Sequence, residues 1–121
     1  MAKQYDLEER TQKFALRVRD FSKRVPKDIA NVEYTRQLIR SSGSIGANYL
    51  EANEALSRKD FVLRIKISRK EAKESRYWLQ LMVPGGDLTN EQRDLIREAT
   101  ELLMIFSAIV RKTQGSTSVT K

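Results

Sequence analysis

Cysteine and histidine are both absent from the 121 residues of this chain. Their absence excludes disulfide bonds, thiol nucleophiles, imidazole bases and the thiolate or imidazole ligands of zinc sites. Proline is scarce, with only Pro26 and Pro84, so little interrupts helical structure. Most familiar catalytic constellations are thereby excluded, and we expect no enzyme, no metal site and no cofactor.

Long apolar runs are missing as well. The first six residues hold no apolar run of the kind found in signal peptides, and the apolar stretches within 102–110 are far shorter than a membrane span. The composition, 40% hydrophobic and 32% charged, is that of a folded globular domain. We therefore expect one cytoplasmic domain over residues 1–121 that does not contact a membrane.

The charge balance is strongly basic. Lysine and arginine number 23 against 16 aspartates and glutamates, which gives a formal net charge of +7 and an isoelectric point near 9.9. A positive field of this size favours polyanions or acidic proteins as partners.

Apolar residues recur at alternating spacings of three and four through most of the chain. This period predicts helices over residues 5–24, 29–55, 58–83 and 90–112, followed by a flexible Ser/Thr/Gly-rich tail over 113–121. Four long helices with short loops predict an all-α fold, an antiparallel up-down-up-down four-helix bundle. The expected core positions are Leu7, Thr11, Phe14, Val18, Phe21, Val25, Tyr34, Leu38, Ser42, Ile45, Tyr49, Ala52, Phe61, Ile65, Ser68, Ala72, Ser75, Leu79 and Met82, with a wide apolar face in the fourth helix made of Leu95, Ile96, Ala99, Leu102, Leu103, Phe106, Ile109 and Val110.

Two helix starts carry capping signals. Ser57 precedes the third helix as an N-cap, and Leu56 is placed to pack on Phe61 as a hydrophobic staple. Thr89, with Gln92 three residues later, has the pattern of a capping box at the start of the fourth helix.

Two helices carry a second apolar or small-residue stripe outside the core positions. A four-helix monomer needs one apolar face per helix, so the surplus predicts contact with further copies of the chain, with a wider core as the alternative. The stripe residues are Ile39, Gly43, Gly46 and Leu50 in the second helix and Leu63, Ile67 and Trp78 in the third. Gly43 to Gly46 also matches the GxxG of nucleic-acid-clamping loops, but it lies inside a predicted helix.

Three carboxylates, Glu51, Glu71 and Glu74, could suggest metal or acid/base chemistry. Bundle metal sites pair such glutamates with histidine, which this chain lacks. We expect structural roles for them, with pairing to a cation such as Arg40 or Lys70. Asn48 is expected to be a hydrogen-bonded polar group at a helix–helix contact.

Basic residues gather on one face of the third helix. Projection at 100° per residue places them in an arc of about 120° that we expect to lie opposite the apolar face. The arc contains Arg58, Lys59, Lys66, Arg69, Lys70, Lys73 and Arg76, with Tyr77 among them. Like charges along one face repel each other, so the pattern favours a nucleic-acid-binding surface, with a merely solvated basic face as the alternative.

Two segments carry a family resemblance. They are Arg40-Ser-Ser-Gly-Ser-Ile-Gly-Ala-Asn-Tyr-Leu-Glu-Ala52 and Ile67-Ser-Arg-Lys-Glu-Ala-Lys-Glu-Ser-Arg-Tyr-Trp-Leu79, together with Lys59-Asp-Phe61. The chain resembles, over about Phe14 to Lys112, the four-helix bundle proteins encoded in the intervening sequences of bacterial 23S ribosomal RNA genes. The residues that carry the likeness are Ser41, Gly46, Ala47, Asn48, Glu51, Lys70, Glu71, Glu74 and Trp78.

The resemblance implies an antiparallel bundle that assembles as a ring-like homopentamer. A related accessory variability protein of diversity-generating retroelements is similar to a basic barrel that binds nucleic acid and a reverse transcriptase. We therefore expect a non-enzymatic, homo-oligomeric bundle that binds nucleic acid, structured RNA above all, through phosphate contacts. The alternative is a protein–protein adaptor or scaffold for a nucleic-acid enzyme such as a reverse transcriptase.

Overall fold

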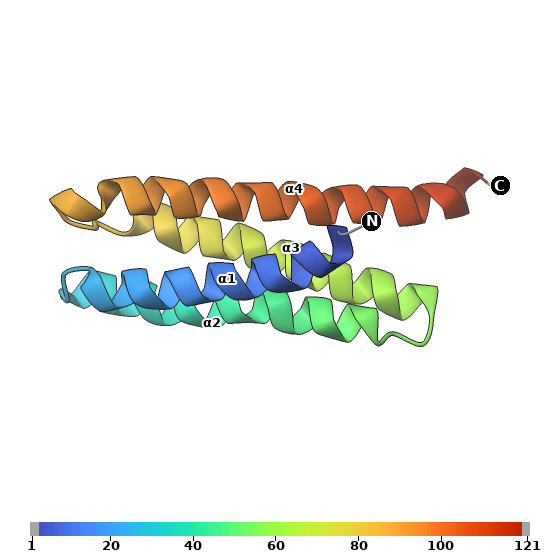
Figure 1. Cartoon of the computed structure of the whole chain (residues 1–121), viewed down its shortest axis with the longest axis horizontal. Coiled ribbons are helices and arrows are strands. Elements are labelled where there is room, and N and C mark those ends of the chain that lie inside the picture. The colour runs from blue at the N-terminus through green and yellow to red at the C-terminus, as the bar shows by residue number, and fades with distance from the viewer. Residues whose placement is uncertain (1–2, 120–121) are drawn as a thin grey trace.

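The predicted antiparallel four-helix bundle is confirmed. The computed structural model describes the backbone of residues 3–119 and the side chains of residues 7–115, and it contains no strand within those limits. Consecutive helices run in opposite directions and lie side by side along one long axis (Figure 1). The elements are α1 (Lys3–Arg24), α2 (Ile29–Asn53), α3 (Arg58–Leu81), the 3₁₀ turn η1 (Gly86–Leu88) and α4 (Thr89–Val119).

The core follows the predicted spacing of three and four. α1 packs against α2 and α4, and α3 packs against the same two helices. The apolar faces of all four helices therefore meet along the bundle axis. Phe14, Ile65 and Phe106 are among the largest side chains buried there. Tyr34 and Phe61, near the ends of the bundle, are only partly buried against this core.

Serines allow a close approach of α2 and α3. The Ser41 and Ser75 hydroxyls share a hydrogen bond of 2.8 Å across the interface, and Ser68 Oγ donates to the Ile45 carbonyl at 2.9 Å. All three serines are fully buried, so these bonds satisfy hydroxyls that water cannot reach. Small side chains on both helices therefore replace bulk with hydrogen bonds at this contact.

The N-cap of α3 is confirmed, but the staple beside it is wrong. Ser57 has an extended backbone, and its side-chain oxygen accepts a hydrogen bond from the Asp60 amide at 3.0 Å. Leu56 is 99% exposed and cannot pack on Phe61, which packs against the core instead. The loop between α2 and α3 thus leaves Leu56 in solvent.

The capping box predicted for α4 is also wrong. The turn η1 precedes Thr89, so this residue already has helical backbone angles (φ −60°, ψ −42°) and cannot adopt the extended form of an N-cap. Gln92 has a different role, because its Nε2 donates to the carbonyls of Leu79 and Met82, both at 2.9 Å. It thereby satisfies carbonyl groups that the end of α3 leaves without helical partners.

The fourth helix is longer than predicted. The flexible tail expected over 113–121 is instead helical through Val119, and residues 120–121 lie outside the described part of the chain. Thr113 Oγ1 donates to the Ile109 carbonyl at 2.9 Å, a bond that satisfies a threonine hydroxyl within a helix. Ser/Thr-rich composition alone therefore did not end the helix.

Candidate nucleic-acid interface

The predicted basic face forms one wall of a groove between α3 and α4. The groove has a volume of about 820 Å³. Its lining comprises Lys66, Arg69, Lys70, Lys73 and Arg76 from α3 and Leu103, Met104, Ser107 and Arg111 from α4. The expectation that the arc lies opposite the core is wrong, because it flanks the core on the side turned toward α4. The cations therefore line a concavity instead of a projecting ridge.

Most charges in this groove are uncompensated. Among the side chains of residues 7–115, Lys66, Arg69, Lys73 and Arg111 have no hydrogen bond or ion pair. Arg76 donates to the neutral hydroxyl of Thr100 at 3.4 Å, which leaves its charge unbalanced. Lys66, Arg69 and Arg76 are only half-exposed, so salt and water screen their charges less than those of fully exposed side chains.

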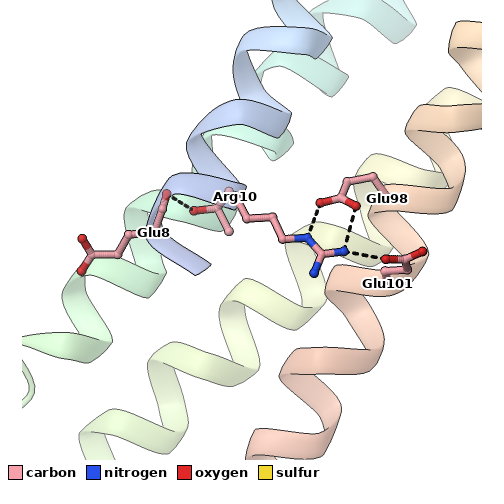
Figure 2. Close-up of polar contacts among 5 residues, drawn as sticks. Glu8, Arg10, Glu98 and Glu101 are labelled. Atoms are coloured by element: carbon pink, nitrogen blue, oxygen red, sulfur yellow. Dashed lines mark hydrogen bonds and ion pairs between the residues drawn. The ribbon is translucent and has the colours of Figure 1, made fainter. Parts of the chain in front are cut away.

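The acids of α4 explain why the groove stays positive, because they face α1. Arg10 of α1 binds Glu98 at 2.6 and 2.9 Å and Glu101 at 2.6 Å (Figure 2). These bonds and charges, those of Glu98 foremost, raise the pKa of Arg10. Arg17 pairs with Glu91 at 3.2 Å in the same way. The bundle thus neutralises the α1–α4 side, and no acidic side chain lines the groove on the α3–α4 side.

The remaining members of the predicted basic set lie around the groove. Arg58 and Lys59 border a second hollow, at the N-terminal end of α3, which Leu63, Lys66 and Gln114 also line. Tyr77 is 54% exposed and makes an edge-to-face contact with Trp78, with ring centroids 5.1 Å apart. An exposed ring beside the cations is a candidate platform for a base.

The residues predicted to contact other copies divide into two groups. Ile39, Leu50 and Leu63 are about half-exposed, and Gly43 faces open space. Val32, which sequence reasoning missed, extends the α2 stripe and is 52% exposed. These residues form an apolar α2 surface, defined here as Val32, Ile39, Gly43 and Leu50, that no segment of the described chain covers.

Gly46, Ile67 and Trp78 do not lie on that open surface. Gly46 faces α1, where an added Cβ would lie 2.9 Å from Thr11 Oγ1, so the prediction that it points away from the core is wrong. Trp78 packs on the core and stacks on Tyr34 with centroids 6.1 Å apart. Ile67 is half-buried. Contacts within the chain therefore explain Gly46 and Trp78, because close helix packing and ring stacking require them.

Replacing Gly46 with leucine should lower the free energy of unfolding by about 1–3 kcal/mol, because the side chain would overpack the contact with Thr11. Gly115→Leu in α4 is the matched control, since it lies away from the apolar α2 surface and nothing lies within 4 Å of its Cβ position. Urea unfolding should show a lower midpoint for the first variant only. Equal midpoints would contradict the close approach of α1 and α2 at this glycine.

The three carboxylates have structural surroundings. Glu74 lies 3.7 Å from Arg40, which is the predicted kind of pair, and Glu51 is exposed. Glu71 is buried, and burial raises the pKa of its carboxyl, with the charge of Glu74 adding to the effect and Arg40 and Lys70 opposing it. No group of three or more potential ligands for a metal ion occurs among the described residues.

Glu71→Gln should stabilise the protein at neutral pH. The raised pKa means that the folded chain holds this proton more tightly than the unfolded chain, so stability falls as pH rises above the ordinary value of 4.5. Melting temperatures of both proteins, measured from about pH 4 to about pH 7, should therefore diverge in favour of the variant as pH rises. A difference that is constant or shrinks over this range would contradict a buried, destabilising carboxylate.

Asn48 has the predicted role. Its Nδ2 donates to the Ser44 carbonyl at 2.9 Å and to Ser44 Oγ at 3.0 Å. Its Oδ1 accepts from Arg64 of α3 at 3.1 Å. The amide thus joins α2 to α3 and belongs to no reactive site.

Sequence reasoning missed the second wall of the groove. Met104, Ser107 and Arg111 recur at spacings of three and four along α4, with Thr100 one turn before them, but they flank a wide apolar face that masked this pattern. The signal is the row of small, polar and basic residues at one edge of that face, on the side away from the acids.

None of the helices in the described part of the chain is long and apolar enough to span a membrane.

Fold and groove together define a class: an antiparallel helical bundle with a basic groove on one side. The model of a family described as 23S rRNA-intervening sequence protein matches residues 3–108. The chain belongs to that family. It is also similar to a crystal structure from Bacteroides thetaiotaomicron, titled as a protein with unknown function from the S23 ribosomal protein family. The two are 32% identical, with a TM-score of 0.73 over 87% of this chain and 98% of the other. A search among curated proteins found no match.

Proposed function

We propose that this protein is a non-enzymatic nucleic-acid-binding bundle whose α3–α4 groove binds phosphates. The observation that carries the proposal is the row of cations in that groove, four of which, Lys66, Arg69, Lys73 and Arg111, have no hydrogen bond or ion pair among the described side chains. Phosphate oxygens are the acceptors that lysine and arginine side chains bind in nucleic-acid complexes. RNA in the cytoplasm is the proposed ligand, in keeping with the family's rRNA-gene origin.

The mode of binding follows from the chemistry of the lining. Most of the lining is cations and aliphatic surface, and contacts of these groups with phosphates and sugars carry no information about the base sequence. Binding should therefore tolerate changes of base sequence. Recognition of a particular RNA would depend on its shape and on several grooves acting together.

We further propose that the protein acts as a homo-oligomer, with a pentameric ring as the form that the family resemblance favours. The apolar α2 surface supports this, since exposed aliphatic side chains along one helix face are typical of a subunit contact. Repetition of one groove around a ring would multiply the affinity for a long RNA through avidity. Gly43→Leu tests this surface, because it adds bulk there and leaves the bundle intact.

The proposed function is tested by the salt dependence of RNA binding. A groove that neutralises four to six phosphates of a single strand should give a log–log slope of about −3 to −4, at about −0.7 per phosphate. Affinity for a labelled RNA, measured by fluorescence anisotropy across a series of salt concentrations, gives this slope. A slope near zero, or no binding even at low salt, would contradict the proposal and favour the adaptor alternative.

A further inference from the structure

We infer that the α3–α4 groove takes one single strand of nucleic acid lengthwise, and that it does not dock a duplex. The inference rests on the proposed function and narrows it to a ligand class. The inference depends on the length of the groove, on its width and on the apolar side chains of its α4 wall.

The length of the cation row fits a short stretch of strand. From Lys66 to Arg76 the row covers ten residues of α3, which is about 15 Å of helix axis at 1.5 Å per residue. A stacked strand advances about 3.4 Å per nucleotide, so about four to five nucleotides lie along this row. Arg111 faces them from the opposite wall. Cations on both walls can therefore contact one phosphate chain from two sides.

The width of the groove excludes a duplex from its interior. Packed helices lie about 8–10 Å apart between axes. A B-DNA duplex is broader than this spacing, because its major groove alone is about 12 Å wide. A duplex would therefore rest on the rims. It would reach the exposed Lys70 and Lys73, but not the half-buried Lys66, Arg69 and Arg76.

The opposite arrangement, with α3 inserted into a duplex groove, is also disfavoured. A recognition helix enters the major groove with an exposed face whose side chains reach the base edges. α3 packs against α2 on one side and α4 on the other, and its cations turn toward α4. Double-stranded RNA is less accessible still, because its major groove is too narrow for side chains to read.

The apolar part of the α4 wall suits the unpaired bases or sugars of a single strand. Leu103 and Met104 supply aliphatic surface on that wall, and Met104 is 63% exposed in the described structure. Unstacked bases have apolar faces that a duplex hides, so only a single strand can cover this surface. Guanidinium planes such as that of Arg69 can also stack on bases.

The test compares one labelled 20-nucleotide RNA of unstructured sequence with the same strand annealed to its complement, in the same buffer. Anisotropy should show at least tenfold tighter binding of the single strand. Equal or tighter binding of the duplex would overturn this inference and leave the proposed function standing. Binding of neither RNA would overturn the proposed function and the inference with it.

A substitution in the α4 wall distinguishes binding in the groove from a general effect of the protein's charge. Met104→Glu adds a negative charge between the walls at an exposed position, so folding should be retained, which circular dichroism checks. Affinity for the single strand should fall at least tenfold. Leu16→Glu on α1 is the matched control, because it makes the same chemical change at a 43% exposed leucine far from the groove. Equal losses in both variants would overturn a groove-bound strand.

Discussion

Reversing three lysine charges in the groove, with Lys66→Glu, Lys70→Glu and Lys73→Glu together, should reduce RNA affinity at least a hundredfold. Each lysine lines the groove, and the change replaces three phosphate-binding cations with anions that repel phosphate. None of the three lysines lies in the buried core, so helix content and oligomeric state should be retained. Anisotropy titration measures the affinity, and circular dichroism with light scattering checks fold and assembly.

A matched variant carries Lys13→Glu, Lys23→Glu and Lys27→Glu, three exposed positions on and just after α1. Both triple variants lower the net charge of +7 by the same amount, so non-specific attraction falls equally. The account expects the α1 variant to retain most of its affinity. Equal loss in the two variants would show that overall charge, and not the groove, attracts the RNA.

Asn31→Ala should lower the free energy of unfolding by about 2–4 kcal/mol, because it leaves several buried backbone groups without hydrogen-bond partners. Asn31 is 1% exposed and lies at the end of the bundle where the chain enters α2. Its Nδ2 donates to the Pro26 carbonyl at 3.0 Å and the Val83 carbonyl at 2.8 Å, and its Oδ1 accepts from the Val83 amide at 3.2 Å. One side chain thus joins the α1–α2 loop to the segment that follows α3.

Asn90→Ala is the control for this effect. Asn90 accepts from Arg93 at 3.3 Å on the exposed surface, where water can replace the bond, so its loss should cost less than about 0.5 kcal/mol. Chemical denaturation of both variants at one temperature supplies the comparison. Similar losses in the free energy of unfolding for the two variants would contradict the role of Asn31 in joining two loops by buried hydrogen bonds.

The helical core was predictable from sequence because burial obeys the helical period. Positions such as Phe14, Ile45 and Leu102 repeat at spacings of three and four, and that spacing alone places them on one side of a helix. Ser57 was predictable for a similar reason, since an N-cap depends on residues three positions apart. Local rules sufficed for these features, but not for the capping box of Thr89 and Gln92, because η1 leads directly into α4 and gives Thr89 a helical backbone.

Other wrong predictions concern contacts between segments distant in sequence. The side chain of Gln92 bonds the end of α3 instead of capping its own helix, and Gly46 meets Thr11 of α1. A helical projection gives the angle of a residue but not which neighbouring helix lies at that angle. Gly46 and Trp78 were accordingly assigned to an outer stripe, although α1 and Tyr34 contact them.

The same limit applies to the candidate site. The α3 cations were identified as one face, but the contribution of α4, including Met104 and Arg111, follows only from the packing of the two helices. The pairing of Arg10 with Glu98 and Glu101 matters equally, because it directs the acids of α4 away from the groove. The spacing of Met104, Ser107 and Arg111 places them on one face of α4, but no spacing within a helix shows which neighbouring helix that face meets.

The central claim, that RNA binds in the α3–α4 groove, is tested most directly by lysine footprinting. The protein is acetylated with and without saturating single-stranded RNA, and mass spectrometry measures the modification of each lysine. The account predicts that RNA protects Lys66, Lys70 and Lys73, which line the groove, and leaves Lys13 and Lys23 of α1 unchanged. Equal protection on both helices, or stronger protection on α1, would contradict it.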